Sequence, residues 1–126
     1  MDRPVRVGIL GGAGYAGAEL LRLLSGHPGA EVVAVTSRHH QGKRVSDLFP
    51  SLRGHIEIPF EAVETRTLAG RCDVVLCAVP HGVAMHEAPT LLEAGVRVVD
   101  LSADFRIADR QRFEYWYGVE HACPEL

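Results

Sequence analysis

Hydrophobic and polar positions along the chain predict strands that alternate with helices. Apolar residues at Val5, Val7 and Ile9 alternate with other residues, which is the pattern of a strand. Apolar residues then recur at helical spacing in 18–24. Glycines concentrate between these two patterns, at positions 11–17. The beginning of the chain therefore predicts a strand, a glycine turn and a helix in direct succession.

The remaining pattern continues this alternation. Residues 73–79 form a continuous apolar run, as expected for a strand that is buried on both faces. We expect the other strands at 31–36, 56–60 and 97–101, and helices at 45–48, 61–70, 81–94 and 109–117. This order predicts an α/β protein with a Rossmann-like, doubly wound parallel sheet. The predicted core consists of Val7, Ile9, Leu20, Leu21, Leu24, Val33, Val35, Val74, Leu76, Val98 and Leu101.

The glycine turn predicts a binding site for the pyrophosphate of a dinucleotide. Two glycine spacings fit: Gly12, Gly14 and Gly17, or Gly11, Gly14 and Gly17. Glycine adopts the torsions of a tight turn and lets an anion approach the backbone. The free N–H groups at the start of the helix then face that anion.

The end of the second strand indicates which dinucleotide binds. An NAD-preferring site usually carries an acidic residue there, about 20 residues past the glycines. Here Ser37 and Arg38 occupy this place, with no acid among residues 36–40. A hydroxyl and a guanidinium suit a 2′-phosphate, which a carboxylate would repel. We therefore predict NADP(H) rather than NAD(H).

Two further strand ends contribute candidate residues, because ligands of open parallel sheets lie beyond the carboxyl ends of the strands. Ala78 and Pro80 follow the strand at 73–79, and Ser102 follows the strand at 97–101; we include all three among the cofactor-binding residues. Asp104 and Arg106 lie in the same loop as Ser102. They either position substrate or cofactor, or form an ion pair that fixes the loop.

Composition narrows the class of protein. The 126 residues suffice for one domain, and 47% are hydrophobic, 23% are charged and the net charge is −3. No basic patch indicates nucleic acid, and no apolar run reaches the length of a membrane span. Three scattered cysteines argue for a reducing compartment, hence a cytoplasmic protein, and no ligand spacing indicates a metal. We expect Cys77 to be a buried, unreactive thiol.

Several short motifs occur along the chain: GGAGYAGAELLRLL at 11–24, HP at 27–28, TSR at 36–38, AVPHG at 78–82, DLSADFR at 100–106, YG at 117–118, His121 and PEL at 124–126. Together they resemble one known family, the N-acetyl-gamma-glutamyl-phosphate reductases, over essentially all 126 residues. DLSADFR and AVPHG are the most specific of these motifs. A reductase of carrier-protein-linked aminoadipyl phosphate and aspartate-semialdehyde dehydrogenase are related families.

The resemblance implies an NADPH-dependent enzyme of arginine biosynthesis. In this family a cysteine thiolate attacks the acyl phosphate, and the resulting thioester is reduced to the semialdehyde with a hydride from NADPH, while a histidine acts as acid and base. It also implies a small-molecule acyl phosphate as substrate and a homo-oligomeric full-length protein. By similarity, the 2′-phosphate would lie against Ser37, Arg38 and His39, and the pyrophosphate against Gly11, Ala13, Gly14, Tyr15, Ala16 and Gly17.

The sequence departs from the family in its catalytic residues. The family's nucleophilic cysteine lies in a later motif with glycine and asparagine, which these 126 residues do not contain. We therefore assign no catalytic residue here, and neither His81 nor His121 is given the acid–base role. We expect 1–126 to be the N-terminal cofactor domain of a two-domain reductase, without its substrate domain and inactive alone. The alternatives are the aminoadipyl-phosphate reductase and a non-catalytic NADP-binding module.

Overall fold

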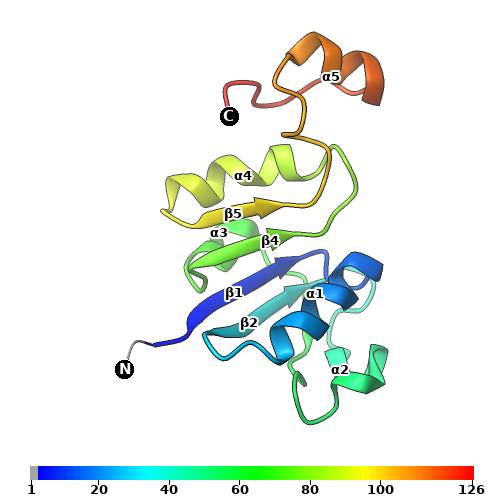
Figure 1. The fold of residues 1–126 in the computed structure, drawn as a ribbon, viewed down its shortest axis with the longest axis vertical. Helices are drawn as coiled ribbons and strands as arrows, with labels where there is room; N and C mark the ends of the chain where they lie inside the picture. Colours follow the sequence, from blue (N-terminus) through cyan, green and yellow to red (C-terminus); the bar gives the residue numbers. More distant parts are fainter. Residues whose placement is uncertain (1–2) are drawn as a thin grey trace.

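The computed structural model describes residues 3–126, and its centre is a parallel sheet of five strands (Figure 1). The strand order is β3-β2-β1-β4-β5, so the first strand lies in the middle of the sheet. Every pairing between neighbouring strands is parallel, as predicted. The strands are β1 (Val5–Leu10), β2 (Ala30–Thr36), β3 (Phe60–Glu61), β4 (Val74–Cys77) and β5 (Arg97–Asp100).

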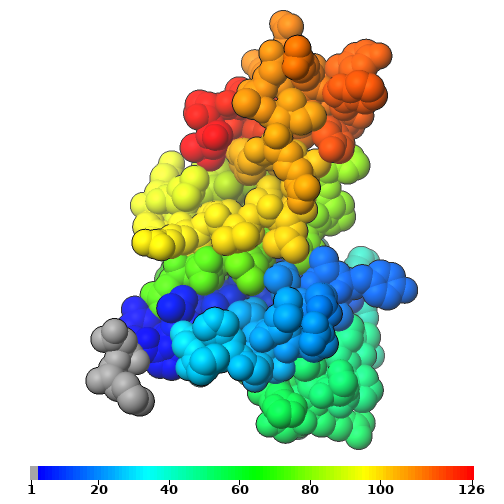
Figure 2. All heavy atoms as spheres, viewed as in Figure 1, coloured from blue at the N-terminus to red at the C-terminus, as the bar shows by residue number. Residues whose placement is uncertain are grey.

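Helices connect the strands and extend the molecule beyond both edges of the sheet. They are α1 (Tyr15–Ser25), α2 (Val45–Leu48), α3 (Thr65–Ala69), α4 (Ala84–Glu93) and α5 (Arg110–Tyr117), with a 3-10 turn at Pro50–Leu52. Figure 2 shows α5 and the last residues at one end of the molecule and the region of α2 at the other. Because both faces of the sheet carry helices, the fold is the predicted doubly wound α/β sheet.

The side chains of the sheet divide into two cores, one on each face, because successive residues of a strand point to opposite sides. Val7 and Ile9 of β1 pack with Leu21 of α1 in the first core. Val75 and Cys77 of β4 pack in the second core, which α3 and α4 cover. Gly8 of β1 faces this second core, where a Cβ would lie 2.6 Å from Cys72 Sγ. The close packing explains the glycine in the middle of a strand.

Four elements are clearly shorter than their patterns predict, among them β4, which covers 74–77 of the predicted 73–79. Residues 58–60 bond mostly to residues 43–45 instead of extending the strand: Val45 N–H donates to Ile58 O and Phe60 N–H to Lys43 O. The helix predicted at 61–70 begins only at Thr65, and that predicted at 81–94 begins only at Ala84. Of the predicted core, Leu101 is wrong: its side chain is 37% exposed, because it follows β5 at the edge of the sheet.

The last residues of the chain are held against α4. Pro89 lies inside α4 and has no N–H to donate to the carbonyl of Met85. The Cys123 thiol uses that acceptor instead, with Sγ 3.0 Å from Met85 O. Phe113 of α5 is buried with Met85 and Cys123 in a third, smaller core. Because Pro89 leaves the Met85 carbonyl without a donor in the helix, that carbonyl can accept a hydrogen bond from Cys123 near the end of the chain.

Candidate functional site

The turn after β1 is fixed to the end of β2 by a threonine. Gly11 N–H donates to Thr36 Oγ1 at 3.0 Å, and Gly12 N–H donates to Thr36 O at 3.0 Å. Gly11 has a positive φ of 78°, which glycine adopts without strain. A Cβ at Gly11 would also lie 2.8 Å from Ala78 O, so β1, β2 and β4 converge tightly on this residue.

Two other glycines allow the turn and α1 to pack together. A Cβ at Gly17 would lie 2.3 Å from Gly12 O, and a Cβ at Gly12 would lie 2.2 Å from Val35 Cγ1. Real Cβ atoms do not approach other atoms so closely, and a backbone carbonyl cannot move aside cheaply. The close packing of α1 against the turn therefore requires a glycine at position 17. Both Gly11 and Gly12 are needed, so the turn satisfies both predicted glycine spacings.

Gly14 differs because no protein atom requires it. It is the N-cap of α1 with ordinary torsions, and the space that its Cβ would enter contains no atom within 4 Å. No side chain caps the helix, and no acidic residue lies in its first turn. The N–H groups of Tyr15, Ala16 and Gly17 begin the helix and have no carbonyl partner within it. Tyr15 is 99% exposed, so both its ring and its backbone N–H are accessible to a ligand at this turn.

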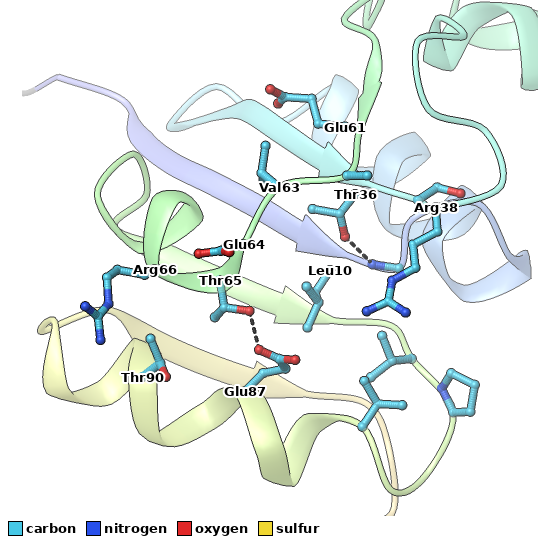
Figure 3. Close-up of a pocket in the computed structure, with 16 residues that line it drawn as sticks. Leu10, Thr36, Arg38, Glu61, Val63, Glu64, Thr65, Arg66, Glu87 and Thr90 are labelled. Carbon is cyan, nitrogen blue, oxygen red and sulfur yellow. Dashed lines mark hydrogen bonds between the residues drawn. The ribbon is translucent and has the colours of Figure 1, made fainter.

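An open cavity of about 790 Å³ lies next to the glycine turn, at the carboxyl ends of the strands (Figure 3). It is bounded by the ends of β1 and β2, by residues 61–66, and by the beginning of α4. Its lining combines apolar side chains such as Leu10 and Val79 with charged ones such as Arg38 and Glu87. Glu87 of α4 accepts a hydrogen bond from Thr65 of α3 (Figure 3). Such a mixture suits a nucleotide, which has an apolar base and charged phosphates.

The predicted 2′-phosphate residues fall partly at this cavity. Ser37 and Arg38 line it, and the Arg38 side chain extends toward it in Figure 3. Arg38 makes none of the ion pairs found among residues 3–126. His39 is exposed and does not line the cavity, so its contact with the cofactor stays a prediction. His40 N–H donates to Ser37 Oγ at 3.3 Å, which orients the hydroxyl.

The candidates after β4 and β5 are placed differently from one another. Pro80 lines the cavity, and Ala78 lies against Gly11 beside it. Ser102 is buried, and its hydroxyl donates to Asp100 Oδ2 at 2.9 Å. Ser102 Oγ also accepts a hydrogen bond from the Asp104 N–H at 3.3 Å. Contact between Ser102 and a cofactor stays a prediction, since Ser102 is buried and its hydroxyl proton is already donated to Asp100.

Asp104 and Arg106 do not form the ion pair considered from the sequence. The Asp104 carboxylate is fully buried and accepts N–H groups from Gly82 at 2.7 Å and Met85 at 2.8 Å. Arg106 donates instead to the carbonyls of Ser102 and Leu101. The Asp104 carbonyl bonds to His121 Nε2, while His121 Nδ1 accepts the Cys123 N–H. Asp104 therefore joins three parts of the chain and has a structural role.

The three thiols are buried, and burial raises the pKa of each of them. For Cys77 the pKa rises to about 12, first through burial and then through nearby acidic side chains such as Asp100. A thiol with so high a pKa is protonated at neutral pH and is a poor nucleophile. The prediction that Cys77 is buried is thus confirmed, and its raised pKa agrees with the expectation of an unreactive thiol.

Sequence reasoning missed part of the cavity. The apolar pattern predicts Thr36 as the end of a strand and does not reveal that its hydroxyl fixes the glycine turn. Residues 62–64 lie in the predicted helix at 61–70 but form an irregular wall of the cavity. The one available signal was the position of residues 61–66 after a short third strand. Glu87 and Thr90 carried no signal, because they look like ordinary polar positions of a helix.

A parallel sheet with a glycine turn, a free helix N-terminus and a cavity at the strand ends defines the class of dinucleotide-binding domains. The family described as "Semialdehyde dehydrogenase, NAD binding domain" matches residues 6–126. The chain belongs to this family, and so it is an NAD(P)-binding domain of the semialdehyde dehydrogenase type.

Similar proteins agree with this assignment. The chain is 56% identical to the N-acetyl-gamma-glutamyl-phosphate reductase of Janthinobacterium sp. (strain Marseille), over 97% of this chain and 35% of that protein. It is 53% identical to the reductase of the same name from Neisseria meningitidis serogroup C, over 100% of this chain and 36% of that protein. The chain thus spans about a third of the length of these relatives.

Solved structures share the fold. The aspartate semialdehyde dehydrogenase of Candida albicans, solved with NADP, has a TM-score of 0.69 and 27% identity, over 82% of this chain and 31% of that one. Aspartate semialdehyde dehydrogenase II of Vibrio cholerae has a TM-score of 0.66 and 21% identity, over 83% and 30% of the two chains. Within residues 3–126, none of the helices is both long and apolar enough to cross a bilayer.

Proposed function

We propose that this chain is the NADPH-binding part of an enzyme that reduces N-acetyl-gamma-glutamyl phosphate to the semialdehyde and releases phosphate, in arginine biosynthesis. The identity of 53–56% to reductases of that name, over 97–100% of the chain, carries this proposal. An aminoadipyl-phosphate reductase or a non-catalytic module has no comparable support among these relatives. Cytoplasmic location and a homo-oligomeric full-length protein are part of the same proposal.

The residues at the cavity fit this cofactor. The N–H groups at the start of α1, together with Gly11, Ala13 and Gly14, are suited to hold the pyrophosphate. Ser37 and Arg38 lie where the 2′-phosphate of NADPH would bind, with Arg38 supplying a positive charge. NADPH bound here would supply a hydride for the reduction of the acyl group.

The acyl-transfer chemistry is assigned to residues outside this chain. The buried thiols of Cys72, Cys77 and Cys123 have raised pKa values, and none of the three lines the cavity. The covalent step of the family needs a thiolate that reaches the substrate. This chain therefore supplies the cofactor site, and its role in the reaction is to bind and orient NADPH.

Cofactor binding can be tested by calorimetric titration with NADPH and NADH in parallel. We expect NADPH to bind more tightly, and Arg38→Ala to weaken NADPH binding about 10–100-fold, because a charge-assisted hydrogen bond to phosphate is lost. NADH binding should change little in this variant. Arg53→Ala removes an exposed arginine that does not line the cavity and serves as the control. Equal affinity of the unmodified chain for both cofactors would contradict the proposal.

The reaction itself can be tested in a chimera. Residues 1–126 would replace the matching segment of the Neisseria meningitidis reductase, which shares 53% identity with them. We expect phosphate-dependent reduction of NADP with N-acetyl-glutamate semialdehyde, and strongly reduced turnover when the chimera carries Arg38→Ala. A folded chimera that binds NADPH but gives no turnover would contradict the proposed reaction.

A further inference from the structure

An acidic residue lies beside the proposed 2′-phosphate site, although on a neighbouring strand. Glu61 of β3 is paired in register with Thr36 of β2. The N–H of Ser37 donates to the carbonyl of Glu61 at 3.0 Å. Glu61, Ser37 and Arg38 all line the same cavity. The chain therefore brings a carboxylate next to the two residues that would bind the phosphate.

If its charge were left unpaired, such a carboxylate would repel the 2′-phosphate and weaken the binding of NADPH. In NAD-preferring sites an acid at the end of the second strand binds the ribose hydroxyls and repels a 2′-phosphate. Neighbouring strands lie roughly 5 Å apart, so an acid at the end of β3 is near enough to act on the same phosphate. The sequence lacks an acid at the end of β2 but has one at the adjacent strand end.

Arg71 neutralises this carboxylate from outside the cavity. It follows α3, and its Nη1 lies 3.0 Å from Glu61 Oε1. Its Nη2 donates to Val33 O of β2 at 3.1 Å, so the guanidinium is fixed to both strands. Figure 3 shows the Glu61 carboxylate turned away from Arg38. The pair is only partly exposed, with 37% of the Arg71 side chain and 28% of the Glu61 side chain accessible.

We propose that Arg71 is a positioning residue for cofactor selectivity: it holds and neutralises Glu61, so that Arg38 meets the 2′-phosphate without a competing negative charge. This inference rests on the proposed NADPH site. Arg71 itself does not line the cavity and need not contact the cofactor. The selectivity for NADPH is thus set by two arginines, one that binds the phosphate and one that removes the charge opposing it.

The test uses 2′,5′-ADP and 5′-AMP, two probes that differ only in the 2′-phosphate. Calorimetry on Arg71→Ala should show affinity for 2′,5′-ADP reduced about fivefold, as expected for one added negative charge several ångströms from the phosphate. Affinity for 5′-AMP should stay within about twofold, since it lacks the group that this charge repels. Adding Glu61→Gln to Arg71→Ala should restore the affinity for 2′,5′-ADP. Arg110→Ala breaks the comparable ion pair with Glu114 on α5 and is the control.

The outcomes separate this inference from the function on which it rests. If the unmodified chain binds 2′,5′-ADP no better than 5′-AMP, the proposed NADPH site is wrong. If it prefers 2′,5′-ADP and Arg71→Ala keeps the same preference, the role of Arg71 is wrong. Should Arg71→Ala fail to fold, Glu61→Gln alone decides: the freed Arg71 charge should tighten 2′,5′-ADP binding at least about twofold. Unchanged or weaker binding in that variant would overturn the inference.

Discussion

At the scale of single residues, glycine is needed at different positions of the first turn for different physical reasons. Gly17 is required by the protein itself, because a Cβ there would overlap the Gly12 carbonyl. Gly14 has open space where a Cβ would be, so only a ligand can require it. The contacts around these two glycines separate the glycine needed for folding from the one needed for binding.

This difference predicts that two alanine substitutions affect different properties, one the stability of the fold and the other the affinity for NADPH. Gly17→Ala should lower the free energy of unfolding by about 2 kcal/mol or more, because α1 must move away from the turn. Gly14→Ala should change stability by less than about 1 kcal/mol but weaken NADPH binding at least about tenfold, since its methyl group blocks close approach of the pyrophosphate. Urea unfolding and calorimetry measure the two effects. A Gly14→Ala variant with unchanged NADPH affinity would argue against the assigned pyrophosphate site.

At the scale of elements, α4 connects the cofactor side of the sheet to the last part of the chain. Its beginning is held by the Asp104 carboxylate, and its interior carbonyl at Met85 accepts the Cys123 thiol. Asp104 belongs to DLSADFR, one of the two most specific motifs of the family resemblance. In this structure Asp104 supports the loop after β4, where Pro80 lines the cavity. Asp104 therefore supports the site without lining the cavity.

We predict that Asp104→Ala destabilises the protein by about 2–5 kcal/mol, because the N–H groups of Gly82 and Met85 lose their acceptor in a buried position. Thermal unfolding measures this change. Asp109→Ala is the matched control: its carboxylate caps α5 through Arg112 N–H but is exposed, so the loss should be about 1 kcal/mol. Equal losses of stability in the two variants would contradict this prediction, because they would show that burial does not strengthen the contribution of the Asp104 hydrogen bonds.

At the scale of the whole molecule, one carboxylate ties the beginning of β1 to the beginning of β4. Asp73, just before β4, pairs with Arg3 at 2.7 Å and with Arg6 at 3.2 Å. It also accepts the backbone N–H of Arg6 at 2.8 Å. The hydrogen bond from the Arg3 guanidinium, followed by those from Arg6, holds the pKa of Asp73 well below its ordinary value. Folding therefore favours the ionised carboxylate.

The lowered pKa of Asp73 predicts a stability effect that depends on pH. Since the pKa is lower in the folded than in the unfolded protein, the stabilisation is complete above the unfolded value of about 3.9 and is lost as pH falls below it. We expect Asp73→Asn to lower the melting temperature at pH 6 and to differ less from the unmodified protein at pH 3. Asp47→Asn, at an exposed acid of α2, should show a smaller dependence. A constant difference between pH 6 and pH 3 would contradict the assignment.

The sequence alone determined the order of the elements and the main features of the cofactor site. Hydrophobic periodicity indicated β1, β2, β4 and β5, and the glycine turn with Arg38 indicated NADP, because these signals are local in the chain. Only the tertiary structure decided what Thr36, Glu61, Arg71 and Asp104 do. Thr36 bonds to Gly11, 25 residues away, and Asp104 bonds to Gly82, 22 residues away. Arg71 bonds to Glu61, 10 residues away, and to Val33, 38 residues away. No local pattern encodes a pairing between polar side chains and backbone groups that meet only when the strands assemble into the sheet.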